Sequence, residues 1–171
     1  MKLQGNLIQM WKTKQENGQE VNRMNSFWGD NTDDKDNTEL RIISCNINGL
    51  SEVDELSQYI IGSLQLSSDI ACFQEINIDT RQYEIVRKLK QVVAKMDDSK
   101  GDAIHMTSSR RIVQDGYRKR GGTMIRVSKK FSGSALDKQQ DPHGRWCSIS
   151  IEGSEGRRLF IYSVYRVCYN T

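Results

Sequence analysis

The sequence has few of the residues that build metal centres or disulfide frameworks. It contains two histidines, His105 and His143, which are too few for a metal site built from histidine. The four cysteines are widely spaced and form no C-x-x-C pair, so a zinc or disulfide framework is excluded. Three lie in apolar segments and the fourth follows another, so we expect buried, reduced thiols in a cytoplasmic or nuclear protein. These cysteines are Cys45, Cys72, Cys147 and Cys168.

Long apolar runs are also missing. No run approaches the roughly 20 residues that cross a bilayer, and residues 1–25 lack the apolar core of a secretory signal. We therefore expect neither a membrane partner nor secretion. Of the 171 residues, 27% are charged and 36% are apolar, which is enough for one polar domain with a core.

The charge is unevenly distributed along the chain. Residues 27–39 hold five acids and one base, whereas residues 107–130 hold eight bases and one acid. A basic block of this kind indicates a polyanionic partner over part of the surface, although a solvated surface loop would have the same composition.

The pattern along the chain predicts an α/β fold. Residues 1–38 are polar and read as a flexible leader with a short amphipathic helix near 7–11, and residues 39–171 form the domain. Two strand–helix units come first. The first helix starts from a capping box at Ser51–Asp54, and the second helix is amphipathic. Hairpin-linked strands follow, which gives a mixed β-sheet with flanking helices. The expected strands are 40–47, 69–74, 103–107, 122–127, 145–151 and 158–165, and the helices are 51–64 and 81–96.

Polar side chains stand where the first two strands end. Asn46 and Asn48 close the first strand, which we expect to be buried, and Glu75 closes the second. If these strands are parallel neighbours, their carboxyl ends meet at one edge of the sheet, where α/β proteins bind ligands. Amide and carboxylate oxygens suit Mg²⁺. Taken alone, N-x-N-G would also fit an ordinary polar turn.

Several motifs together carry a family resemblance. They are ISCNINGL, DIACFQE, HMTSSRR, YRKRGGTMI, DPHGRWCSI and RRLFIYSVYRVC, in that order. Over residues 40–171 the chain resembles the endonuclease/exonuclease/phosphatase superfamily, and within it the apurinic-like endonucleases of non-LTR retrotransposons. The resemblance implies Mg²⁺-dependent phosphodiester hydrolysis of DNA. Alternatives are a non-catalytic nucleic-acid-binding remnant and a phosphatase or phosphodiesterase of the same superfamily.

The resemblance also assigns residues to roles. It implies that Asn46 and Glu75 bind Mg²⁺, or Mn²⁺ in its place, that Asn48 supports the metal site, and that Tyr165 contacts phosphate. The chain departs from the family's Tyr-x-Pro, because Arg166, Val167 and Cys168 follow Tyr165. Glu75, Tyr165 and Asn48 are thus the expected catalytic residues. The expected DNA-binding residues are Arg118, Lys119, Arg120 and Arg145.

Part of the family pattern is absent. After the tyrosine the family has Asp-x-Asn and later Asp-His, but this chain contains neither D-x-N nor Ser-Asp-His. We therefore expect the N-terminal part of a two-sheet α/β sandwich, or a decayed remnant of one. It should supply mostly the first sheet, with an uncovered inner face, and be inactive by itself. Expected partners are DNA, the C-terminal remainder of the domain and a reverse transcriptase region.

Overall fold

The computed structural model describes residues 35–36, 38–48, 53–95, 101–109 and 121–166. The chain divides into two units, Met1–Glu39 and Leu40–Thr171, and every helix and strand below belongs to the second. In the first unit, the Asp36 carboxylate accepts hydrogen bonds from the backbone N–H and the hydroxyl of Thr38. The predicted helix near 7–11 and the predicted capping box at Ser51 lie outside the described residues.

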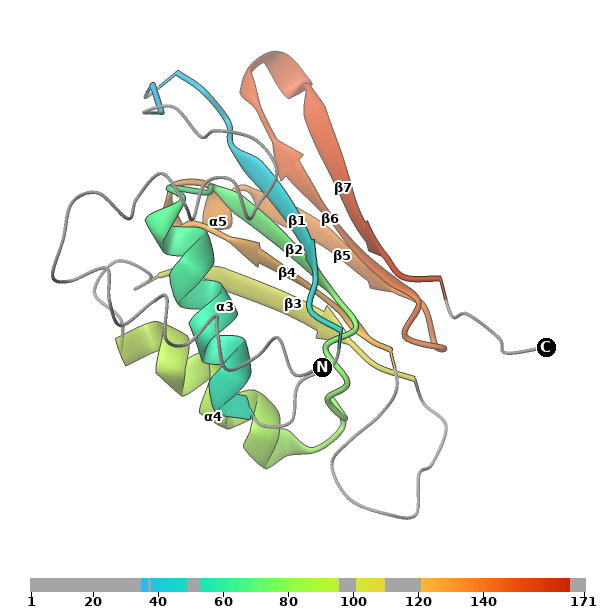
Figure 1. The fold of residues 1–171 in the computed structure, drawn as a ribbon. Helices are drawn as coiled ribbons and strands as arrows, with labels where there is room; N and C mark the ends of the chain where they lie inside the picture. The colour runs from blue at the N-terminus through green and yellow to red at the C-terminus, as the bar shows by residue number, and fades with distance from the viewer. Residues whose placement is uncertain (1–34, 37, 49–52, 96–100, 110–120, 167–171) are drawn as a thin grey trace, which may run out of the picture. The chain divides into compact units, whose positions relative to one another are not determined.

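The first sheet is mixed, as expected for this α/β fold. Its strand order is β1-β2-β4-β3, in which β1 is parallel to β2 and the other neighbours are antiparallel. Two helices, α3 and α4, lie on one face of it (Figure 1). All six elements are within two residues of the predicted bounds. They are β1 (Ile42–Asn46), α3 (Val53–Gln65), β2 (Ile70–Gln74), α4 (Tyr83–Lys95), β3 (Ala103–Thr107) and β4 (Thr123–Val127).

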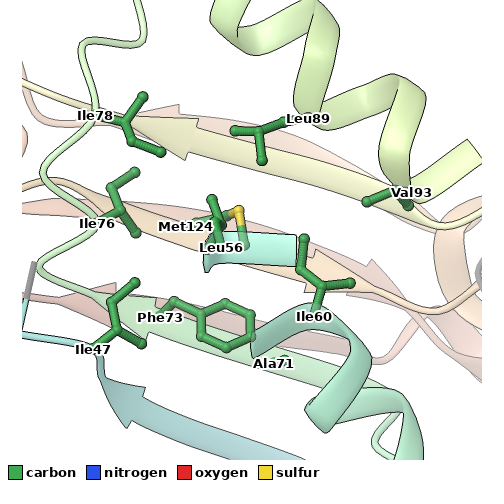
Figure 2. Close-up of a cluster of buried hydrophobic side chains, with 10 residues drawn as sticks. All are labelled: Ile47, Leu56, Ile60, Ala71, Phe73, Ile76, Ile78, Leu89, Val93 and Met124. Atoms are coloured by element: carbon green, nitrogen blue, oxygen red, sulfur yellow. The ribbon is translucent and has the colours of Figure 1, made fainter. Parts of the chain in front are cut away.

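A core lies between the helices and the first sheet. Leu56 and Ile60 of α3, four residues apart, point to the same side as Leu89 and Val93 of α4 (Figure 2). The exposed face of α4 carries the charged residues, as the amphipathic pattern predicts. The buried members of this core are Ile47, Leu56, Ile60, Ala71, Phe73, Ile76, Ile78, Leu89, Val93 and Met124.

The second sheet corrects one expectation. The inner face of the first sheet is not uncovered, because three antiparallel strands in the order β5-β6-β7 pack against it. The hairpin of β6 and β7 was predicted, but β5 was missed since most of its side chains are polar and exposed. The new elements are α5 (Lys129–Ser132), β5 (Ala135–Gln140), β6 (Trp146–Glu152), η2 (Ser154–Gly156) and β7 (Arg158–Val164).

The two cores explain why β2 is continuously apolar. Ala71 and Phe73 face the helices, while Ile70 and Cys72 face the second sheet and share a core with Cys147 of β6. A strand covered on both faces has no polar side, so the run predicts its burial correctly. By contrast β1 is an edge strand with alternating exposure, not the buried strand that its apolar residues suggested.

The described cysteines are free thiols. Cys72 and Cys147 are buried, and burial raises their pKa values to about 11 and about 12. Cys45 is only partly buried, and burial raises its pKa to about 11. These thiols are therefore protonated and structural, as the sequence predicted, while Cys168 lies outside the described residues.

The predicted basic block is not one surface. Arg126 is 1% exposed, and its guanidinium pairs with the buried carboxylate of Asp102 (Nε–Oδ2, 2.7 Å). Lys129 and Lys130 are exposed on α5, which follows the carboxyl end of β4. The other bases of the block, including Arg118, Lys119 and Arg120, lie outside the described residues. No helix in the described parts of the chain is long and apolar enough to cross a bilayer.

Candidate functional site

One end of the two packed sheets gathers Asn46, Asn48, Glu75, Arg145 and Tyr165, which the sequence singled out. Since β1, β2 and β3 run in the same direction and β4 runs opposite, three carboxyl ends and one amino end meet there. The β5–β6 loop reaches the same end. A Cβ added to Gly144 in that loop would lie 2.4 Å from the Ser109 nitrogen, so the loop rests directly on the chain after β3.

Asn46 and Glu75 converge at this end. Asn46 is the last residue of β1 and lies opposite Gln74, so Glu75 follows immediately beyond the pairing. The Asn46 Nδ2 donates a hydrogen bond to the Glu75 Oε1 at 2.8 Å. The strand–helix–strand pattern thus correctly predicted that the two residues lie at the ends of adjacent strands. The expected convergence of their side-chain oxygens is not seen, because the Asn46 oxygen accepts from the Asn48 N–H and its nitrogen faces Glu75.

The backbone around these residues adopts left-handed conformations. Asn48, Glu75 and Asn77 have φ values of 49°, 56° and 51°. Asparagine visits this region readily, but a glutamate there carries backbone strain, a feature that clusters at functional sites. Asn48 contributes through its backbone, because its N–H donates to the Asn46 Oδ1 at 2.9 Å.

Asn77 is a site residue that the sequence analysis missed. Its Oδ1 accepts a hydrogen bond from the Gly121 N–H at 2.7 Å, and its own N–H donates to the Gly121 carbonyl at 2.8 Å. These two bonds fix the segment before β4 against the segment after β2. The polar run after Glu75 was visible in the sequence, but its partner Gly121 is 44 residues away.

Tyr165 lies at the same end, next to Gly121. A Cβ added to Gly121 would lie 3.0 Å from the Tyr165 Cε1, so the ring covers this glycine. The Tyr165 N–H donates to the Arg145 carbonyl at 2.6 Å, which continues the β6–β7 pairing. The structure therefore places Tyr165 against Gly121, which Asn77 contacts. Asn77 in turn is two residues after Glu75 in the chain.

Arg145 is held by an acid that the sequence analysis did not select. Its Nε and Nη2 donate to the two carboxylate oxygens of Asp141 at 2.8 and 3.1 Å. The Asp141 side chain is 5% exposed, whereas that of Arg145 is 54% exposed. Hydrogen bonds from Arg145 lower the pKa of Asp141 to about 2, so the carboxylate stays ionised. The guanidinium is oriented and still open to solvent.

Gln74 links the two sheets beneath the site. Its Nε2 donates to Ser163 Oγ on β7 at 3.1 Å and to Ser44 Oγ on β1 at 3.2 Å. The Ser163 hydroxyl in turn donates to the Phe73 carbonyl at 3.3 Å. β7, which leads to Tyr165, is therefore tied to β2, which leads to Glu75.

The donor set has the chemistry of a magnesium site but few ligands. Glu75 offers a carboxylate and Asn46 an amide oxygen, both hard donors that Mg²⁺ prefers. In the observed rotamer the Asn46 amide nitrogen faces Glu75, so its oxygen would have to rotate toward the ion. Within the described ranges, no group of three or more His, Cys, Asp or Glu residues is placed to hold a metal. The histidine of β3, His105, bonds the Gln139 carbonyl instead (2.9 Å).

No family model matches the sequence, and no curated protein matches it. Solved structures with a similar fold include a 3′ phosphatase, NExo, from Neisseria, bound to a product DNA hairpin. It is 16% identical with a TM-score of 0.44, over 71% of this chain and 40% of that chain. An AP endonuclease from Archaeoglobus fulgidus is 16% identical with a TM-score of 0.41, over 71% and 40%.

The catalytic domain of human nocturnin is also similar, at 16% identity and a TM-score of 0.42, over 72% of this chain and 48% of that chain. All three neighbours are members of the endonuclease/exonuclease/phosphatase superfamily. The chain spans less than half the length of each of them. At TM-scores below 0.5, these similarities assign no chemistry to its residues.

Proposed function

We propose that the chain carries the metal-binding and phosphate-binding half of a Mg²⁺-dependent phosphodiesterase that hydrolyses DNA, of the retroelement endonuclease type. The observation that supports this most directly is the convergence of Asn46 and Glu75 at the carboxyl ends of adjacent parallel strands. A strained glutamate that meets an amide at a ligand-binding edge is poorly explained by folding alone.

Each residue at this end has a role in the proposal. Glu75 and Asn46 would hold Mg²⁺, or Mn²⁺ in its place, once the Asn46 oxygen, which accepts from the Asn48 N–H in the observed rotamer, turns toward the ion. Asn48 would support the site by shaping the loop after β1, with its φ of 49°. Bound there, the ion would polarise the phosphoryl oxygens and offset the charge that develops on them. Tyr165 and the solvent-exposed face of Arg145 would contact phosphates of the DNA backbone.

The described residues leave the proposed reaction incomplete. Among the described residues, none is assigned the role of activating water, and a site with two protein ligands would bind Mg²⁺ weakly. We therefore propose that a C-terminal remainder of the domain supplies the missing groups, and that a reverse transcriptase region follows that remainder. The free thiols favour a cytoplasmic or nuclear location.

Paramagnetic broadening by Mn²⁺ tests the proposed metal site in the chain as it exists. Titrating Mn²⁺ into labelled protein should selectively broaden the NMR signals of residues 46, 48 and 75–77, and excess Mg²⁺ should restore them. Glu75→Gln should remove the broadening, because a neutral amide cannot replace the carboxylate charge. Glu84→Gln, at an exposed glutamate of α4, is the matched control. Broadening that is absent, or that survives Glu75→Gln, would remove Glu75 from the proposal.

The shortage of carboxylates favours a second candidate, a non-catalytic nucleic-acid-binding protein that keeps Arg145 and the basic segments without turnover. The two candidates differ in a polypeptide that includes any downstream remainder. Metal-dependent nicking of supercoiled plasmid, abolished by Glu75→Gln with DNA binding unchanged, would support the nuclease. Binding without nicking in that longer polypeptide would support the second candidate.

A further inference from the structure

Two arginines in the loops at the site end of the sheets are held in the same way. Arg81, which has no role in the proposed function, lies between β2 and α4 and bonds to Asp79. Its Nε and Nη2 donate to the two carboxylate oxygens at 2.9 and 2.7 Å, and its backbone N–H donates to Oδ1 at 3.1 Å. Arg145 bonds to Asp141 through the same three donors. Each carboxylate therefore fixes both the backbone and the side chain of one arginine.

In both pairs the positive group is the exposed one. The Arg81 side chain is 41% exposed and that of Asp79 is 6% exposed, a contrast that resembles the pair of Arg145 and Asp141. A molecule that approaches from solvent thus meets a guanidinium before it meets a carboxylate. Neither loop adds an exposed acid, since residues 80–83 are Thr-Arg-Gln-Tyr and residues 142–145 are Pro-His-Gly-Arg. Guanidinium groups presented in this way favour an anion, and phosphate most of all.

Ser108, the residue after β3 that both loops contact, links the two arginines in space. Its Oγ accepts a hydrogen bond from the Thr80 N–H at 3.0 Å, and a Cβ added to Gly144 would lie 2.8 Å from its Cα. Arg81 follows Thr80 and Arg145 follows Gly144, so the Cα atoms of the two arginines lie within about 20 Å of each other. One turn of B-DNA is about 34 Å long, so both can reach phosphates of the same turn.

We propose that Arg81 is a second phosphate contact, and that Arg81 and Arg145 form an arginine clamp that holds two phosphates of a DNA backbone. The inference rests on the proposed function for its DNA partner, but it needs neither the metal ion nor a catalytic step. A guanidinium that a buried carboxylate already orients loses little side-chain freedom when it binds, which lowers the entropic cost of the contact. Two linked contacts favour a polymer of phosphodiesters over a molecule with one phosphate.

The salt dependence of DNA binding, measured without divalent metal, tests the clamp. Fluorescence anisotropy of a labelled DNA duplex in EDTA gives the affinity at increasing NaCl concentration, and the logarithmic slope counts the phosphates that are contacted. Arg81→Gln should lower the slope by about 0.9 and the affinity about tenfold at ~50 mM salt. The double variant Arg81→Gln/Arg145→Gln should lower the slope by about 1.8, because each arginine contacts a different phosphate.

Arg158→Gln is a matched control for these variants. Arg158 also pairs with a carboxylate, that of Asp137, and its side chain is 43% exposed, but it begins β7 whereas Tyr165 follows the other end of that strand. Its replacement should leave the slope unchanged. Arg81→Lys keeps the charge but loses the two-point bond to Asp79, so it should keep most of the slope and still bind more weakly than the wild-type chain. Circular dichroism of each variant checks that the fold is kept.

The possible outcomes separate this inference from the proposed function. If Arg145→Gln lowers the slope and Arg81→Gln does not, the clamp is overturned and the phosphate contact of Arg145 stands. An equal loss in Arg158→Gln would also overturn the clamp, because the effect would then be one of net charge. In the wild-type chain, displacement of the duplex by inorganic phosphate as readily as by unlabelled duplex would show single-phosphate binding and overturn it too. Absence of salt-dependent DNA binding by the wild-type chain would overturn both the clamp and the proposed DNA partner.

Discussion

At the residue scale, the site is organised by short polar side chains that bond to backbone groups. Asn46 accepts from the Asn48 N–H, and Asn77 accepts from the Gly121 N–H. Such bonds stabilise residues in the left-handed conformation and need only a short side chain. Asn46 is exposed and Glu75 is half-buried, and the bonds of Asn46 and Asn77 fix the backbone around them.

Replacing Asn77 should loosen the link between Glu75 and Tyr165. Asn77→Ala leaves the partly buried Gly121 N–H without its acceptor, which should cost about 1–3 kcal/mol of unfolding free energy. Urea denaturation measures this loss. Asn77→Asp keeps the acceptor oxygen and should retain most of the stability. Equal destabilisation by both variants would show that the side-chain bond to Gly121 is unimportant.

The pH dependence of stability should depend on Asp141. Its pKa in the folded chain is about 2, below the ordinary value of 3.8, because Arg145 stabilises the ionised form. A folded-state pKa below the unfolded one adds stability above about pH 4, and that stability is lost as the pH falls toward 2. Unfolding free energies of Asp141→Asn should therefore vary less over this interval than those of the wild-type chain. Parallel pH profiles would contradict the assignment.

At the element scale, the strands that were predicted best are those with one dominant signal. The apolar run of β2 indicated burial on both faces, and the 29-residue separation of Asn46 and Glu75 fitted a parallel strand–helix–strand unit. β5 gave no such signal, because it is a polar edge strand. It belongs to the sheet by pairing with β6 of the adjacent hairpin, which its own residues do not indicate. The contact of Asn77 with Gly121 depends on β4 lying beside β2, an order that local patterns do not specify.

Arg126 of β4 links Asp102, which directly precedes β3, to the end of α3. The Arg126 Nη1 also donates to the hydroxyls of Ser63 and Ser68, at 3.0 and 3.1 Å. Arg126→Met should cost about 3–5 kcal/mol of unfolding free energy, because it leaves the Asp102 carboxylate buried without its partner. The double variant Arg126→Met/Asp102→Asn removes that charge and should recover part of the loss in urea denaturation. A single variant that costs less than about 1 kcal/mol would mean that the pair is already hydrated.

At the scale of the whole molecule, the chain should bind DNA without cutting it. If it contacts about four phosphates, its affinity should fall on the order of a hundredfold between ~50 and ~200 mM salt. Fluorescence anisotropy measures the slope, and Arg145→Ala should reduce it by about one contact. Lys130→Ala should change it less, since α5 follows the carboxyl end of β4, away from the site. Nicking of plasmid by this chain with Mg²⁺, stopped by Glu75→Gln, would show that the catalytic groups are already present.

Gly144 lies where the β5–β6 loop contacts the chain after β3. Its φ of +72° and the 2.4 Å approach of an added Cβ to the Ser109 nitrogen leave room for hydrogen alone. A single methyl group at this position would push the β5–β6 loop away from Ser108 and Ser109. Because Arg145 is the next residue and its carbonyl accepts from the Tyr165 N–H, such a displacement would move both residues. The position of Arg145, one of the proposed phosphate contacts, thus depends on a neighbour that has no side chain.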